Sequence, residues 1–303
     1  VYRTAHHRFY PGIDRYYTPF ISPTQNHVFT PRDRRELDPA NNAGFVLVPQ
    51  LLGKNTDDMI WAAGELRRMG YREIDINLGC PSGTVLAKGK GAGMLADPDM
   101  LDRFLDRLFD GTDMDISVKT RLGVKRAEEF IPLLEVFGRY PLKRLIIHAR
   151  TAAEMYSGDV HREYFSYAAE HTSIPLSYNG DLFSKDDITR FLSAYPKTEA
   201  VMIGRGLIED PGLVCGGDAD TLRAFHAELC ERYPVVFGNK NSAMHRMKAI
   251  WAYMVLPYPN SEKWKKRIIK AKHWNELLSL ADRILSLEKG ERSSRPAGPS
   301  GAR

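Results

Sequence analysis

Short apolar runs alternate with longer amphipathic stretches from about residue 13 to residue 215. The runs are of strand length and rich in β-branched residues, and they lie at residues 45–50, 73–78, 115–119, 144–148, 174–178 and 200–203. A further candidate strand covers residues 13–20, and helical patterns fall at 56–70, where Thr56 is the expected N-cap, and at 98–109, 126–138, 161–171 and 184–194. Alternation of strands with helices predicts a parallel sheet and an α/β fold.

Polar side chains capable of chemistry stand at the end of nearly every predicted strand. They are Gln50, Asn77–Cys80, Lys119 and Arg121, His148 and Arg150, Asn179 and Asp181, and Arg205. In a closed barrel every strand ends at the same face, whereas a doubly wound sheet uses only the strands near its switch point. The pattern therefore favours a TIM (β/α)8 barrel. Seven strands are counted, so the first strand is expected to precede Val1, with residues 1–12 forming a helix and a loop.

The pattern changes to helices alone after about residue 216. Three helices are predicted, at residues 220–233, 241–256 and 261–288. We therefore expect a barrel domain over 1–216, a small all-α domain over 217–288, and a disordered tail over 289–303 that is rich in Ser, Pro, Gly and Arg.

Charge is divided unevenly between these parts. Residues 220–290 hold 13 Lys and Arg against 7 Asp and Glu, while residues 1–219 carry a net charge of −3. Lys265, Lys266 and Arg267 belong to a basic stretch at 263–272, with tryptophans close by. This combination favours RNA or another polyanion as partner, although an ordinary solvated helix face explains the same charge.

Composition narrows the class of protein. Of the 303 residues 43% are hydrophobic, which suffices for a large core, but no apolar run approaches the ~20 residues of a membrane span. No secretory signal opens the chain, and its first residue, Val, suggests a fragment or a processed product. Cys80, Cys215 and Cys230 are too few and too scattered for a disulfide scaffold or a metal site. We expect a reduced, cytoplasmic setting, a monomer, no metal and no membrane.

Cys80 is the sharpest chemical feature, within Asn77-Leu78-Gly79-Cys80-Pro81. It lies on the loop that leaves a predicted strand, and so beside whatever the barrel binds. A lone cysteine is more often a buried structural residue, but the neighbouring Gly, Pro and polar strand ends favour a functional thiol. With a reference pKa of about 8.5, a thiol stays protonated at neutral pH and can act as an acid.

Cationic and glycine-rich segments follow this position. The loop at 88–93 (Lys-Gly-Lys-Gly-Ala-Gly) can approach a ligand closely and meet phosphates through residues such as Lys90, or it can be a flexible, solvated loop. Lys119 ends a strand, where an anionic ligand or a neighbouring carboxylate would balance its charge.

The later strand ends offer further contacts. His148 and Arg150 are two residues apart and are expected on one face, a pairing that favours a ligand contact over a satisfied core position. Asn179-Gly180-Asp181 and Gly204-Arg205-Gly206 end the last two strands, where barrels of this kind usually bind phosphate.

Together these residues resemble the tRNA-dihydrouridine synthase (Dus) family over about residues 1–285. The resemblance rests on Gln50, Asn77–Pro81, Lys90–Gly93, Val118–Arg121, Ile147–Arg150, Asn179–Asp181 and Gly204–Gly206 in this order. It implies an FMN-binding TIM barrel followed by a helical tRNA-binding domain. The family begins with a strand and loop bearing Ala-Pro-Met-x-Gly-like residues that line the flavin, and this chain starts just after that segment.

The resemblance also implies a mechanism and a set of contacts. NADPH, or NADH, reduces the flavin, a hydride passes from flavin N5 to C6 of uracil, and Cys80 gives a proton to C5 of the extruded base. The implied flavin contacts are Gln50, Lys119 and His148 at the ring or ribityl chain, and Asn179, Gly180, Asp181, Gly204 and Arg205 at the phosphate. The implied tRNA contacts are Asn77, Lys90, Arg150, Lys265, Lys266 and Arg267, and His148 could instead face the uridine.

Two other functions fit parts of the pattern. A flavin barrel that reduces or oxidises free pyrimidines, of the dihydroorotate or dihydropyrimidine dehydrogenase type, would be active without RNA. The basic helical part and the Ile-His-x-Arg strand end argue against it. A non-catalytic tRNA-binding relic without the first strand would be colourless and would still bind tRNA.

Overall fold

The structure is a computed structural model that describes residues 1–290, so most of the tail predicted at 289–303 lies outside the described residues. The chain forms two compact units. The barrel unit consists of Arg15–Asp181 and Thr189–Met202, and the helical unit consists of Val1–Asp14, Leu182–Ile188 and the segment that begins at Ile203. This division differs from the single boundary expected at residue 216/217, because the helical unit also takes in the N-terminal segment and two pieces that precede residue 216.

All strands of the barrel unit run parallel. They are β1 (Arg15–Tyr17), β2 (Val46–Val48), β3 (Gln50–Leu51), β4 (Glu73–Leu78), β5 (Asp115–Arg121), β6 (Arg144–His148), β7 (Leu176–Asn179) and β8 (Ala200–Met202). β1 pairs with β2, and the second sheet has the order β3-β4-β5-β6-β7-β8. The strand predicted at 45–50 is divided at Pro49, which has no N–H to donate to a neighbouring strand.

The predicted fold class, a TIM barrel followed by a helical region, is confirmed. Among the described residues no ladder joins β8 to β1, and the further strand expected before Val1 stays a prediction. None of the described helices is both long and apolar enough to cross a lipid bilayer.

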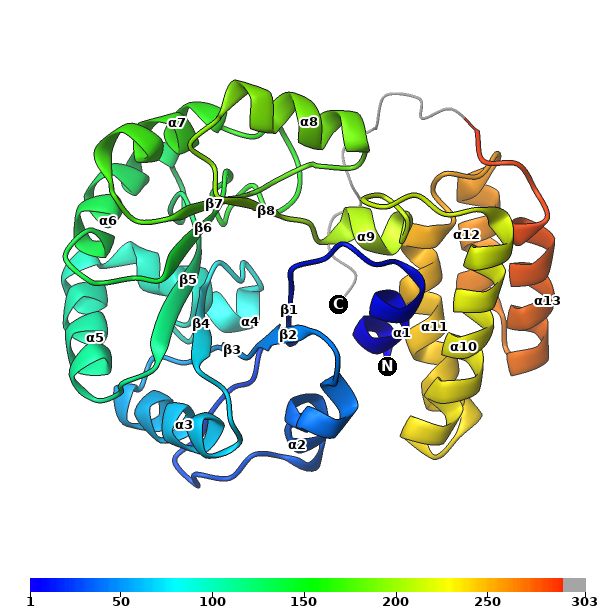
Figure 1. Ribbon diagram of the computed structural model, residues 1–303, viewed down its shortest axis with the longest axis horizontal. Helices are drawn as coiled ribbons and strands as arrows, with labels where there is room; N and C mark the ends of the chain where they lie inside the picture. Colours follow the sequence, from blue (N-terminus) through cyan, green and yellow to red (C-terminus); the bar gives the residue numbers. More distant parts are fainter. Residues whose placement is uncertain (291–303) are drawn as a thin grey trace. The chain divides into compact units, whose positions relative to one another are not determined.

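Crossover helices lie outside the strands of the barrel unit (Figure 1). They include α3 (Thr56–Arg68), α5 (Pro98–Asp110), α6 (Phe130–Phe137) and α7 (Arg162–His171). Helix α8 (Lys185–Ala194) begins in a segment of the helical unit and belongs to the barrel unit from Thr189 onward. Helix α5 begins where Asp97 accepts a hydrogen bond from the backbone N–H of Met100 at 2.9 Å, and it buries Leu101, Phe104, Leu105 and Leu108 on one face. Asn55 rather than Thr56 caps α3, since its side chain accepts from the Asp58 N–H.

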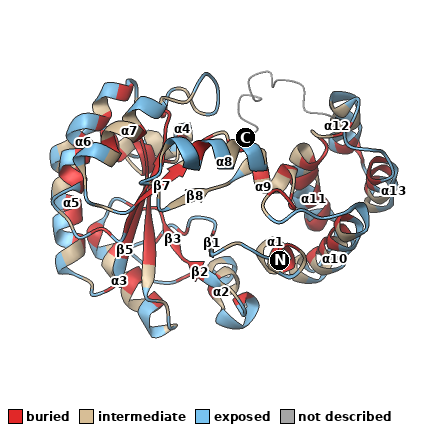
Figure 2. Ribbon diagram, turned by 45° about the horizontal axis from the view of Figure 1, so that its top comes forward, coloured by how far each residue is buried: buried red, intermediate tan, exposed pale blue. Residues whose placement is uncertain are grey.

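Shorter elements fill the connections. They are α2 (Pro31–Leu37), α4 (Gly83–Leu86) and the 3-10 turns Pro39–Asn42, Gly91–Ala96 and Ala127–Glu129. The strands they connect form the buried centre of the barrel unit (Figure 2).

Polar residues alternate with apolar ones along these strands. On β4, Ile74, Ile76 and Leu78 are fully buried on one side, and Asp75 and Asn77 are buried on the other. At the amino-terminal ends of the strands, Arg144 lies 2.6 Å from the Glu199 carboxylate and 3.8 Å from that of Glu73. One side of β4 is thus polar, and the buried Arg144 guanidinium has two carboxylates as counter-charges.

The helical unit contains α1 (Tyr2–Phe9), α9 (Arg205–Glu209), α10 (Ala219–Phe237), α11 (Lys240–Met254), α12 (Ser261–Lys270) and α13 (Trp274–Leu285). Helix α1 belongs to this unit because the rings of Tyr2 and Tyr10 pack edge-on against Phe225, each with centroids 5.4 Å apart. The helix predicted at 220–233 continues through Pro234 to Phe237.

The single helix predicted at 261–288 is wrong, because it is divided into α12 and α13. Ala271 and His273 have extended backbones at the break. The Lys248 ammonium donates to the carbonyl oxygens of Ile269, at 3.0 Å, and Ala271. These bonds satisfy carbonyl groups that a continuing helix would otherwise have bonded internally.

Candidate active site

The carboxyl ends of three neighbouring strands bring predicted site residues together. In the β-sheet register Gln50 on β3 lies opposite Asp75 on β4, and Asn77 on β4 lies opposite Lys119 on β5. Adjacent partners in a parallel sheet are ~5 Å apart, so these side chains share one small region. Cys80 follows two residues after β4 ends and enters the same region.

A chain of hydrogen bonds connects the centre of the barrel unit to the Cys80 loop. Ser117 Oγ donates to Asp75 Oδ1 at 3.1 Å, and Gln50 Nε2 donates to Asp75 Oδ2 at 2.7 Å. Asn77 Nδ2 donates to Gln50 Oε1 at 2.7 Å, while Asn77 Oδ1 accepts from the backbone N–H of Cys80 at 2.9 Å. Each amide is fixed in orientation by its neighbours, and the backbone beside the thiol is fixed in turn.

The charges in this region influence one another. Burial raises the pKa of the Asp75 carboxyl to about 7, against the opposing effect of its hydrogen bonds from Gln50 and Ser117. Desolvation lowers the pKa of the Lys119 ammonium to about 8, and the Arg121 charge lowers it further, while Asp75 and Cys80 raise it. Asp75 is thus a carboxylate whose charge favours the protonated form of Lys119. A ligand contact of Lys119 stays a prediction.

The loop that carries Cys80 is held closely on both sides. The Ala92 N–H donates to the Cys80 carbonyl at 3.2 Å, and Arg121 Nε donates to the Gly79 carbonyl at 2.9 Å. Gly91 has a φ of +55°, and a Cβ there would lie 3.0 Å from the Cys80 carbonyl oxygen and 3.1 Å from its Cβ. Only glycine fits this position without a shift, and the half-buried thiol remains free of disulfides.

His148 and Tyr156 form a second group with Arg121. His148 lies opposite Arg121 on β5 and Asn179 on β7 in the register, and it is 5% exposed. The Tyr156 ring centroid lies 6.1 Å from that of His148 and 5.3 Å from Cζ of Arg121. Burial lowers the pKa of Arg121 to about 10, although Tyr156 opposes this change. His148 therefore shares this region with two residues that were not assigned roles from the sequence.

Arg150 and Asp181 are engaged with each other. Arg150 donates to the Asp181 carboxylate and, at 3.1 and 2.6 Å, to the carbonyl oxygens of Ser157 and Gly158. Its side chain is 2% exposed, and Nη1 is buried without a hydrogen-bond partner among residues 1–290. The tRNA role predicted for Arg150 and the phosphate role predicted for Asp181 stay predictions.

Asn179 and Gly180 make local contacts of their own. Asn179 Nδ2 donates to the Met202 carbonyl at 2.8 Å, which joins the ends of β7 and β8. Gly180 has a φ of +151°, and a Cβ there would lie 2.9 Å from the Tyr178 hydroxyl. Close packing thus accounts for the glycine, and its predicted phosphate contact stays untested.

Lys90 belongs to the barrel unit, where it is the N-cap of the 3-10 turn Gly91–Ala96, and its predicted tRNA contact stays a prediction. The other predicted residues belong to the helical unit. Gly204 is the N-cap of the short helix α9, and Cζ of Arg205 lies 5.6 Å from the ring centroid of Phe183. Lys265, Lys266 and Arg267 are on α12, where Cζ of Arg267 lies 5.0 Å from the ring centroid of Trp264.

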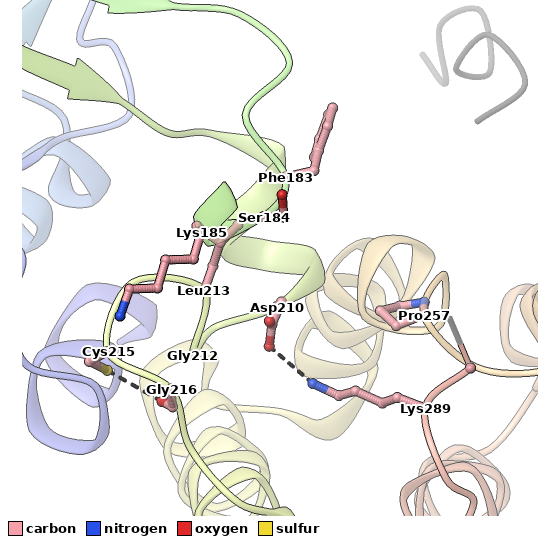
Figure 3. A pocket seen from close by; sticks show the side chains of 11 residues that line it. Phe183, Ser184, Lys185, Asp210, Gly212, Leu213, Cys215, Gly216, Pro257 and Lys289 are labelled. Carbon is pink, nitrogen blue, oxygen red and sulfur yellow. Dashed lines mark hydrogen bonds and ion pairs between the residues drawn. The ribbon is translucent and has the colours of Figure 1, made fainter. Parts of the chain in front are cut away.

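The helical unit also contains a pocket, shown in Figure 3. Its lining includes Phe183, Lys185, Asp210, Cys215 and Lys289. Lys289 Nζ donates to Asp210 Oδ1 at 3.0 Å, and Cys215 Sγ donates to the Gly216 carbonyl at 3.4 Å. No residue predicted for the site lines this pocket.

Sequence reasoning missed Asp75, Ser117 and Tyr156. Asp75 could have been found, since it stands between Ile74 and Ile76 and, by the period of two, on the same face as Asn77. Tyr156 lies in a loop beyond β6, and no periodic signal marks it.

Comparisons with known proteins agree with this arrangement. The family model for dihydrouridine synthase (Dus) matches residues 2–280. A probable tRNA-dihydrouridine synthase 1 of Synechocystis sp. is 28% identical, over 78% of this chain and 65% of its own length. A tRNA-dihydrouridine(16) synthase of Ralstonia nicotianae is 29% identical, over 67% of this chain and 64% of its own length. The chain thus spans somewhat less than two thirds of these curated relatives.

Among solved structures, histamine dehydrogenase from Rhizobium sp. 4-9 is similar with a TM-score of 0.51 and 11% sequence identity, over 75% of this chain and 43% of that one. At this identity the likeness concerns the fold alone. The match of the family model across nearly all of the described residues decides the relationship: the chain belongs to the dihydrouridine synthase family.

Proposed function

We propose that this protein binds FMN at the carboxyl ends of the barrel strands and reduces uridine in tRNA to 5,6-dihydrouridine, with NADPH or NADH as reductant. The observation that carries the proposal is the hydrogen-bond chain from Asp75 through Gln50 and Asn77 to the Cys80 backbone, beside the Lys119 ammonium. Family membership and the names of the curated relatives support the choice of substrate.

The residues around Cys80 fit a flavin. The isoalloxazine ring presents carbonyl oxygens and ring nitrogens, and these need donors such as the Lys119 ammonium and the Gln50 and Asn77 amides. Arg150 Nη1 is a buried donor without a partner in the described chain, which suits an acceptor from a ligand. Lys119, Gln50 and His148 would hold the ring or ribityl chain, and Asn179, Gly180, Asp181, Gly204 and Arg205 the phosphate end.

When bound, the flavin supplies the hydride that reaches C6 of uracil. Cys80 supplies the proton for C5, because its thiol is half-buried and carried on a backbone that Asn77 and Arg121 hold in place. Lys119 remains able to carry positive charge near neutral pH and would stabilise negative charge that develops nearby. A positioned acid of this kind typically contributes ~10²- to 10⁴-fold in rate.

Helix α12 would hold the tRNA. Its residues Lys266 and Arg267 are exposed, Lys265 is half-exposed, and Arg267 and Arg283 stack on Trp264. Cations that contact phosphates release counterions, so the affinity should fall steeply as salt is raised.

Mass spectrometry of tRNA tests the proposal. Cells that lack the gene should lose dihydrouridine from at least one tRNA, and restoring the full-length gene should return it. The purified protein should be yellow and should oxidise NADPH. A colourless protein that still binds tRNA would instead support a non-catalytic tRNA-binding protein. Turnover of free uracil or orotate without RNA would support a flavin enzyme that acts on free pyrimidines.

A further inference from the structure

Three lysines from two loops stand around the Cys80 segment. Lys54 follows β3, and Lys88 and Lys90 follow α4. The Lys54 side chain lies against Gly89, the residue between Lys88 and Lys90. A Cβ built on Gly89 would lie 3.7 Å from Lys54 Nζ and 3.9 Å from its Cδ. Gly89 has a φ of +62°, which gives the loop the sharp turn that places Lys88 and Lys90 on either side of it.

No acidic group in the described chain neutralises this cluster. The described residues hold no ion pair of Lys54, Lys88 or Lys90. The carboxylates closest to Lys54 in sequence are already paired, Asp57 with Arg107 at 2.7 Å and Asp58 with His27 at 3.3 Å. Lys54 lies against Gly89, between Lys88 and Lys90 in sequence, so three cations without a carboxylate partner in the described chain belong to one region of the surface, where an anion from outside would be attracted.

Lys54 does not stabilise α3, the helix that it precedes. Asn55 is the N-cap of α3, so Lys54 immediately precedes the positive end of the helix dipole. A cation there is unfavourable, whereas Asp57 and Asp58 in the first turn are favourable. Local stability therefore gives no reason for a lysine at this residue.

The cluster is connected directly to the proposed acid. Lys90 is followed by Gly91, whose built Cβ would lie 3.1 Å from the Cβ of Cys80, and then by Ala92, whose N–H bonds the Cys80 carbonyl. A nucleotide whose base reaches Cys80 would bring its own phosphate and that of its neighbour to the rim of this loop.

We propose that Lys54, together with Lys88 and Lys90, forms a phosphodiester clamp that holds the RNA backbone flanking the target uridine. The inference rests on the proposed function for the identity of the polyanion and adds a residue, Lys54, and a subsite to it. It makes the barrel unit a binding surface for RNA, in addition to the basic helix α12 of the helical unit.

The test is the salt dependence of RNA binding, measured by fluorescence anisotropy with a labelled, unmodified tRNA transcript. Each lost phosphate contact should lower the slope of log Kd against log salt concentration by about 0.7–0.9. Over a fourfold rise in salt, the Kd of such a variant should therefore increase by a factor roughly threefold smaller than the Kd of wild type. Lys54→Gln should therefore lower the slope by about one contact, and Lys54→Arg should retain it.

Lys143→Gln is the matched control. Lys143 is on the same unit, and its ammonium is half-exposed and lies 3.2 Å from the Asp115 carboxylate at the opposite, amino-terminal edge of the sheet. This variant removes the same charge and should leave the slope at the wild-type value.

The inference is overturned if Lys54→Gln and Lys143→Gln give equal slopes. It is also overturned if Lys54→Gln leaves the slope unchanged and instead raises the KM for NADPH, since the lysine would then serve the reductant. If the wild-type protein makes no dihydrouridine but Lys54→Gln lowers the slope, the clamp stands and the proposed reaction fails.

Discussion

His226 makes the stability of the helical unit dependent on pH. The residue is buried on α10, its Nε2 accepts from Trp251 Nε1 at 3.1 Å, and burial lowers its pKa to about 4 despite the opposing charge of Asp282. In the unfolded chain the imidazole titrates near its ordinary value of 6.5. Between these values the unfolded state binds more protons, so the free energy of unfolding falls as pH drops from about 6.5 to about 4.

The magnitude follows from the gap between the two pKa values. At ~1.4 kcal/mol per pH unit, His226 accounts for a loss of ~3 kcal/mol over that range. Replacing it by Phe removes this titration but leaves the Trp251 N–H without its acceptor, at a cost of ~1–3 kcal/mol. His226→Phe should therefore be less stable than wild type by ~1–3 kcal/mol at neutral pH, and the two should converge between pH ~6 and ~4, where the titration loss of wild type equals that cost.

Urea unfolding followed by the helical circular dichroism signal measures this effect. His245→Phe, at an exposed position on α11, is the control and should change the free energy of unfolding by no more than ~0.5 kcal/mol at any pH. His6, whose pKa burial also lowers to about 4, remains in every variant and leaves a residual acid dependence. Curves for wild type and His226→Phe that stay parallel from neutral to acid pH would refute the reasoning.

Three further outcomes are expected. Charge reversal at residues 265–267 to Glu should weaken tRNA binding at low salt by at least ~10-fold while NADPH still reduces the flavin, and unchanged affinity would make α12 an ordinary solvated face. Gly91→Ala should lower the rate of dihydrouridine formation and should lower the free energy of unfolding by ~1 kcal/mol or more, because a Cβ meets the Cys80 carbonyl at 3.0 Å and φ is +55°. A thermal unfolding midpoint equal to that of wild type would contradict this. Asn77→Ala should lower kcat, since the Cys80 N–H loses its acceptor, and an unchanged kcat would show that the loop is held by other contacts.

The sequence predicted the barrel strands well because their signal is local. The runs at 73–78 and 144–148 coincide with β4 and β6, because Ile74, Ile76 and Leu78 recur with the period of two in β4 and residues 145–147 are a continuous apolar run in β6. The proximity of Gln50, Asn77 and Lys119 was also predictable, because parallel neighbouring strands direct their carboxyl ends to one face.

Tertiary contacts explain what the sequence did not reveal. The break between α12 and α13 has no Gly or Pro to mark it and depends on Lys248, which lies more than twenty residues earlier on α11. Asp75 takes part in the hydrogen-bond chain because Gln50 on β3 and Ser117 on β5 donate to its carboxylate, and these contacts are not visible in the sequence. Helix α1 joined the helical unit through the ring of Phe225, more than two hundred residues away in sequence.

Single-turnover reduction of uridine by Cys80→Ala is the most direct test of the central claim. The variant should retain flavin, NADPH oxidation and tRNA affinity, since the bonds that hold the loop use the Cys80 backbone and none in the described part of the chain uses its thiol. It should form dihydrouridine at least ~10²-fold more slowly. A rate within a few-fold of wild type would show that another group delivers the proton, and the thiol would lose its place in the mechanism.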